Sequence, residues 1–108
     1  MALTQDFKLT VQARAERDPA FRQALFQHGV QALFKGDVPE GRVALRTYIN
    51  ATIGFEALAE ATQTPPKSLM RMFGPKGNPT AANLFAVINA LQGDTGVRLK
   101  VRAVAGAA

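Results

Sequence analysis

The sequence predicts a mainly α domain of five to six helices with one β-strand near its C-terminus, and three patterns support this prediction. Apolar residues recur at helical spacing over most of the chain. Capping residues followed by proline separate these runs. One short segment near the end alternates strictly between apolar and basic residues, as half-buried strands do. With 108 residues, the chain is long enough for one domain with a single hydrophobic core.

Residues 1–53 contain three predicted helices. An aspartate side chain can accept a free backbone N–H at a helix start, and proline fits the first helical position. Glu40 follows Asp37 by three residues, which is typical of a capping box. The predicted helices are residues 4–17, a helix from Asp18-Pro19 to Gly36, and a helix from Asp37 that stops before Gly54.

Residues 54–92 form the predicted core of the domain: two short helices joined by a tight turn, then a basic loop and another helix. In the last helix, the apolar residues at helical spacing are Leu84, Phe85, Ile88 and Leu91, which we expect to line its inner face. The boundaries are Gly54 for the first short helix, Thr64-Pro65 to about Phe73 for the second, and Asn78-Pro79 to Gly93 for the last.

The two short helices have the pattern of a helix-turn-helix unit. Alanine at position 59 suits the point where the helices cross, because a larger side chain would push them apart. Phe55 and Leu58 flank it, and Leu69 and Met72 would be the inner residues of the second helix.

The outer face of that second helix has the chemistry of a DNA-contacting surface. Lys67 and Arg71 lie four residues apart, hence on one side of a helix, where they can reach guanine edges or phosphates. Ser68 can hydrogen-bond to either, and Pro66 lies beside it. We therefore expect this helix to recognise DNA.

The net charge of +5 is concentrated in the C-terminal part of the chain. Residues 1–63 carry seven Lys/Arg and seven Asp/Glu, whereas residues 64–108 carry six Lys/Arg against Asp94 alone. A basic excess on one part of a chain is typical of proteins that bind polyanions. Charge and helix pattern therefore predict the same surface.

The residue inventory argues against catalysis. There are no cysteines, and His28, Ser68 and Tyr48 are the only residues of their kinds. Nucleophilic catalysis needs such groups within hydrogen-bond reach of each other, whereas His28 and Ser68 lie on segments with different expected roles. We therefore expect no enzymatic activity, no metal site and no cofactor. Without an apolar run near 18 residues or a secretory signal, a cytoplasmic location is expected.

The segment Gly54–Leu91 resembles the helix-turn-helix of Cro and lambda-repressor-like regulators. The wider stretch Leu33–Val101, with LFKGD, LAEATQTPPKSLMRMFGPKGNPT and the alternating segment, is similar to HigA-like addiction-module antidote proteins. This resemblance implies a homodimeric antitoxin that binds a palindromic operator, represses its own operon and neutralises a small RelE-like toxin. It also implies DNA contacts from Thr64, Pro66, Lys67, Ser68, Arg71, Lys76 and Asn78.

The turn departs from the family pattern, and the toxin-related role has alternatives. Gln63 stands where these families usually carry glycine, so either Gln63 is left-handed or the turn has another shape. One alternative is a protein-interaction module that sequesters a toxin and has incidental DNA affinity. Another is a repressor without a toxin partner.

The alternating segment Gly96–Arg102 predicts a dimerisation strand over residues 96–103. A single strand leaves its edge groups unpaired, and the same strand of a second copy is the simplest partner. Val97, Leu99 and Val101 would then form the dimer contact. Alternatively, the basic residues between them only keep an exposed edge from aggregating.

Overall fold

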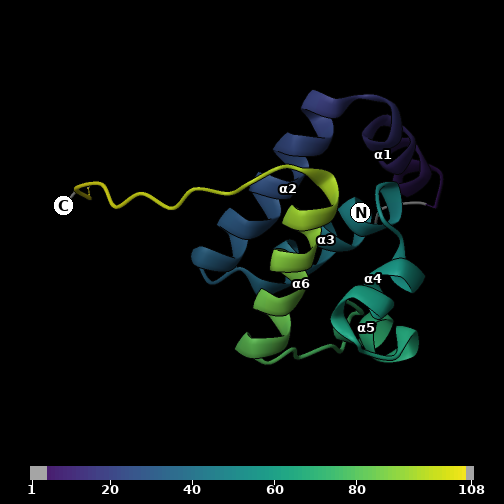
Figure 1. Ribbon diagram of the computed structural model, residues 1–108. Coiled ribbons are helices and arrows are strands. Elements are labelled where there is room, and N and C mark those ends of the chain that lie inside the picture. Colours follow the sequence, from purple (N-terminus) through teal and green to yellow (C-terminus); the bar gives the residue numbers. More distant parts are fainter. Residues whose placement is uncertain (1–4, 107–108) are drawn as a thin grey trace.

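The computed structural model describes residues 5–106, which fold into six helices (Figure 1). The predicted mainly α class is confirmed. None of the helices in this range is both long enough and apolar enough to cross a membrane. In chain order the helices are α1 Gln5–Arg17, α2 Pro19–Phe34, α3 Val38–Ala51, α4 Phe55–Thr62, α5 Pro66–Met72 and α6 Ala81–Thr95.

One apolar core connects five of these helices. α2 and α3 share the most extensive helix contact, α1 lies against both, and α4 contacts α5 and α6. The rings of Phe26 and Tyr48 stack between α2 and α3 with their centroids 4.6 Å apart. The helix pair α4–α5 is attached to the rest of the domain through this core. Its buried members are Phe26, Val30, Leu45, Tyr48, Ile49, Phe55, Leu58, Ala59, Leu69, Phe73, Val87, Ile88 and Leu91.

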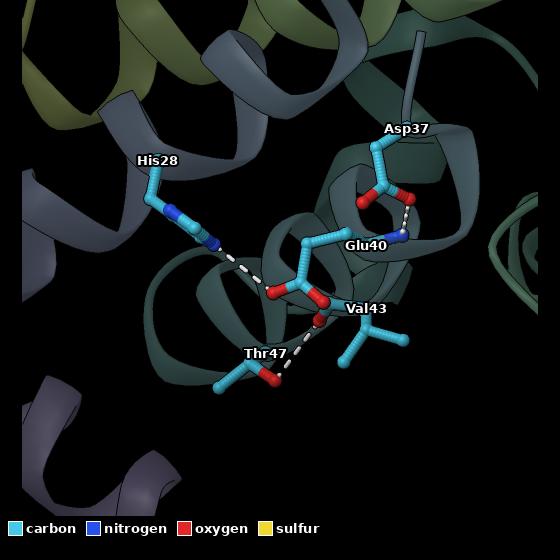
Figure 2. Close-up of polar contacts among 5 residues, drawn as sticks. All are labelled: His28, Asp37, Glu40, Val43 and Thr47. Atoms are coloured by element: carbon cyan, nitrogen blue, oxygen red, sulfur yellow. Dashed lines mark hydrogen bonds and ion pairs between the residues drawn. The ribbon is translucent and has the colours of Figure 1, made fainter. Parts of the chain in front are cut away.

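The predicted starts of α2 and α3 are confirmed. The Phe21 N–H donates to the Asp18 carboxylate at 3.1 Å, and this bond holds the pKa of Asp18 below its ordinary value. The Glu40 N–H donates to the Asp37 carboxylate at 3.3 Å, which caps α3 (Figure 2). Gly36 follows the end of α2 with φ +87°, a backbone conformation that glycine adopts without strain.

The predicted start of α5 is wrong by one residue. Pro65 occupies the cap position and Pro66 is the first helical residue. Thr64 belongs to the end of α4 instead, because its N–H donates to the Ala59 carbonyl at 3.0 Å. Its hydroxyl donates to the Thr62 carbonyl at 3.2 Å and is not available as a cap for α5.

Both predicted ends of α6 are also wrong, by two or three residues. Thr80 rather than Asn78 caps the helix, accepting a hydrogen bond from the Asn83 N–H at 3.1 Å. The helix passes through Gly93 and ends at Thr95, and Gly96, whose φ is +74°, is its C-cap. Each prediction selected the first residue of a suitable type, and a second suitable residue nearby supplies the cap.

Phe85 is an exception to the predicted inner face of α6. Val87, Ile88 and Leu91 form the buried stripe of this helix, and Leu84 packs at its margin. Phe85 lies beyond the edge of that stripe and is 56% exposed, so its predicted place in the core is wrong.

After α6 the chain extends away from the helices, as the yellow segment of Figure 1 shows. Residues 97–106 belong to no helix, and within the described range they form no strand. A strand requires a partner, and residues 5–106 contain no other strand with which this segment could pair. Pairing across a dimer stays a prediction.

Candidate nucleic-acid interface

The turn between α4 and α5 contains the one non-glycine residue of the described chain with a positive φ. Gln63 adopts φ 53° and ψ 42°, the left-handed conformation. This is one of the two outcomes expected from the missing glycine. The turn therefore keeps a tight shape at the expense of backbone strain at Gln63.

Replacing Gln63 with glycine is expected to raise the free energy of unfolding by about 1 kcal/mol, since glycine adopts this conformation without steric cost. Thr62→Gly, one residue earlier and inside α4, is the matched control and is expected to lower it by about 1 kcal/mol. Urea unfolding of both variants measures the effect. A loss of stability in Gln63→Gly would show that the glutamine side chain itself stabilises the turn.

The inner faces of α4 and α5 meet in the core. Phe55, Leu58, Ala59 and Leu69 are buried, with Leu58 and Leu69 fully inaccessible. Met72 is partly buried against the same cluster. The residues expected between the two helices are thus inside, and the opposite face of α5 is left to solvent.

The solvent face of α5 carries two cations. Pro66, Lys67 and Arg71 are exposed, whereas Ser68 is only partly exposed. Thr64 is also partly buried in the turn, so its hydroxyl is less accessible than expected. Lys76 and Asn78 are exposed on the loop that follows α5. The structure thus brings Lys67 and Arg71 onto one helix face, followed by a loop with a third cation.

No acidic residue lies between Glu60 and Asp94 in the sequence. Among the described side chains, Arg14 pairs with Asp18 and the His28 ring contacts Glu40, and neither contact involves α5 or its loop. The charges of Lys67, Arg71 and Lys76 are therefore not neutralised by a neighbouring carboxylate. The acidic residues of α4, Glu56 and Glu60, are exposed, so α4 itself adds no basic charge to this surface.

Arg42 of α3 fixes the loop after α5, a role that the sequence did not predict. Its guanidinium donates to the Gly74 carbonyl at 3.0 Å and also to the Gly77 carbonyl. These partners are 32 and 35 residues away in the chain, so no local pattern points to them. Gly77 lies so close to α5 that an added Cβ would clash with the Arg71 and Met72 carbonyl oxygens.

His28 forms a polar contact on a separate pair of helices. Figure 2 shows its ring on α2 directed at Glu40 on α3, with Nε2 and Oε1 3.0 Å apart. The side chains are 58% and 52% exposed, so a pair of this kind contributes at most about 1 kcal/mol. In the same view Thr47 donates to the Val43 carbonyl within α3. Of these two contacts, only the His28–Glu40 pair links α2 to α3.

The residues expected at the dimer contact have different environments. Val97 and Leu99 are half-buried and pack against the core of their own chain. The Leu99 N–H donates to the Gln92 side-chain oxygen at 2.8 Å. Val101 is 78% exposed. The first two residues are thus partly occupied by intrachain packing, and Val101 is free to contact another molecule.

Comparison of the chain with protein-family models, curated proteins and solved structures gave no match.

Proposed function

We propose that this protein is a sequence-specific DNA-binding transcriptional regulator in which α4 and α5 act as a helix-turn-helix and α5 is the recognition helix. The observation that carries this proposal is the exposed, unneutralised pair Lys67 and Arg71 on the outer face of α5. The inner face of the same helix is held by the fully buried Leu69. A rigid helix with cations on one side suits insertion into the major groove.

The dimensions and chemistry of α5 agree with this role. An α-helix with its side chains is about 10–12 Å across, and the major groove, about 12 Å wide, admits it. Arg71 can donate two hydrogen bonds to a guanine edge, and Lys67 can reach a base or a phosphate. Lys76 and Asn78 on the anchored loop would contact the phosphate backbone, which sets the orientation of the protein on DNA.

A palindromic operator requires two recognition helices about 34 Å apart, so the proposed regulator is a homodimer. We place the dimer contact at the C-terminal segment with Val97, Leu99 and Val101. What supports this is that residues 97–106 form no strand with any other described residue and that Val101 is exposed.

An autorepressing antitoxin with a small RelE-like toxin partner is the narrower form of the proposal, and the sequence resemblance alone supports it. Inspection of the neighbouring reading frame for a small basic protein tests this form. A repressor without a toxin would retain all DNA contacts. A toxin-sequestering module with incidental DNA affinity would show little sequence preference between DNA duplexes.

Arg71→Ala and Lys76→Ala are expected to affect DNA binding differently. The test uses a duplex that the wild-type chain selects from a random pool, with a scrambled duplex for comparison. Arg71→Ala should weaken selected-duplex binding by about 1–3 kcal/mol and relax its preference over the scrambled duplex. Lys76→Ala should weaken both duplexes about equally and reduce the slope of affinity against salt by about one ion.

Lys35→Ala is the matched control, because it removes an exposed cation at the end of α2 rather than on α5 or its loop. It should leave the preference for the selected duplex unchanged. Wild-type affinity in both Arg71→Ala and Lys76→Ala would reject the proposed surface. Failure of the wild-type chain to select any duplex would reject the function.

A further inference from the structure

An apolar groove lies where the C-terminal segment leaves the domain. It has a volume of about 600 Å³ and is lined by α2, α6 and residues 97–102. Phe34 from α2 and Phe85 from α6 both line it, and they remain 60% and 56% exposed. Two large aromatic side chains in one groove, next to the exposed Val101, form an apolar surface that an additional chain segment could cover.

We infer that the occupant of this groove is the C-terminal segment of a second copy, which pairs antiparallel with residues 97–103. The inference specifies the dimer of the proposed function. The segment itself indicates the occupant, because it leaves the helices toward the C-terminus (Figure 1). Val97 and Leu99 pack against their own core, whereas Val101 and Val104 are exposed apolar residues.

The backbone of the segment has one occupied edge and one free edge. The N–H groups of Val97 and Leu99 donate to side-chain oxygens of Thr95 and Gln92 at the end of α6, so this edge is already occupied. In an extended chain, alternate residues direct their N–H and carbonyl groups to the opposite edge. Within the described residues, no hydrogen bond reaches the backbone of Arg98, Lys100 or Arg102, the residues of that free edge.

The sequence of the segment determines the register of pairing. VRLKVRA, residues 97–103, alternates apolar and basic residues symmetrically about Lys100. Directly opposite residues of an antiparallel pair point to the same face, so pairing Lys100 with its own symmetry mate keeps all apolar residues on one face. Leu99 then lies opposite the partner's Val101, and Val97 lies opposite the partner's Ala103. Both pairs lie at the groove with Phe85.

This register also places like charges opposite each other. Lys100 faces Lys100 of the partner subunit, and Arg98 faces the partner's Arg102. Such pairs destabilise a strand pair, and salt screens them. The dimer should therefore tighten as salt rises, in contrast to DNA binding, which salt weakens.

The chain contains no cysteine, so single cysteine substitutions test the register directly. Lys100→Cys should form a covalent dimer with a short thiol-reactive cross-linker in the absence of DNA. Arg98→Cys alone should not cross-link. Its two thiols are four residues apart along the paired strands, which is a distance of about 13 Å. A mixture of Arg98→Cys and Arg102→Cys should cross-link. Cross-linking of Arg98→Cys alone, with none from Lys100→Cys, would overturn the register.

Sedimentation without DNA tests the groove. Phe85→Lys should weaken the dimer about tenfold or more, since it places a charge in an apolar contact. Leu9→Lys, at a residue of α1 that is similarly exposed at 53%, should not. Wild-type dimerisation in Phe85→Lys, or a monomeric wild-type chain, overturns the inference. If the wild-type chain is a dimer that binds the selected duplex but Lys100→Cys does not cross-link, only this strand pairing is rejected. The proposed function then stands.

Discussion

Replacing Leu69 with alanine is expected to lower the free energy of unfolding by about 2–5 kcal/mol, because the side chain is fully buried. A helix of seven residues is too short to be stable alone, so α5 depends on this contact with the core. Urea unfolding monitored by circular dichroism measures the loss. DNA affinity should fall as well where the variant is partly unfolded.

Met70→Ala is the matched control for this prediction. Met70 is the next residue on α5 and is 49% exposed, so its replacement should change stability by about 0.5 kcal/mol or less. The denaturant dependence of unfolding should stay the same in both variants if only native packing is altered. Equal effects of Leu69→Ala and Met70→Ala would contradict the orientation of α5.

Arg42→Met is expected to release the loop between α5 and α6. A hydrogen bond to a charged group contributes about 1.5–3 kcal/mol, and Arg42 donates to two carbonyl groups of this loop. We expect the free energy of unfolding to fall by about 2 kcal/mol, because Arg42 is partly solvent-exposed. We also expect weaker binding to selected and scrambled duplexes alike, because Lys76 loses its fixed position.

Arg46→Met separates this effect from a simple loss of charge. Arg46 lies one turn further along α3, and its side chain is also partly buried. This variant should keep near wild-type stability and a wild-type ratio between the two duplexes. Unchanged DNA affinity in a folded Arg42→Met variant would show that Lys76 needs no anchored loop.

Local chemistry decided which parts of the fold were predictable. Asp18 and Asp37 cap helices through hydrogen bonds to residues three positions away, so the sequence contains the whole signal. The prediction that Asn78 and Gly93 mark the ends of α6 is wrong, because Thr80 and Gly96 are equally suitable cap residues and lie nearby. A choice between two such residues depends on how the loop packs, which a local pattern does not contain.

The candidate site was predictable to the extent that helical spacing determines it. Lys67 and Arg71 were placed on one face of a helix from a four-residue spacing, and the structure has them exposed there. Arg42 was missed because its partners are distant in the chain. Phe85 was misplaced because apolar character alone does not distinguish a core residue from one that lines an open groove.

The stacked ring of Tyr48 gives the protein an internal optical probe. The chain has one tyrosine and no tryptophan, so its tyrosine fluorescence comes from a single ring in the core. Burial raises the pKa of Tyr48 above its ordinary value, so in the folded chain its phenolate absorbance appears at a higher pH than in the unfolded chain. Emission and alkaline absorbance therefore report separately on the opening of the α2–α3 contact, without any attached label.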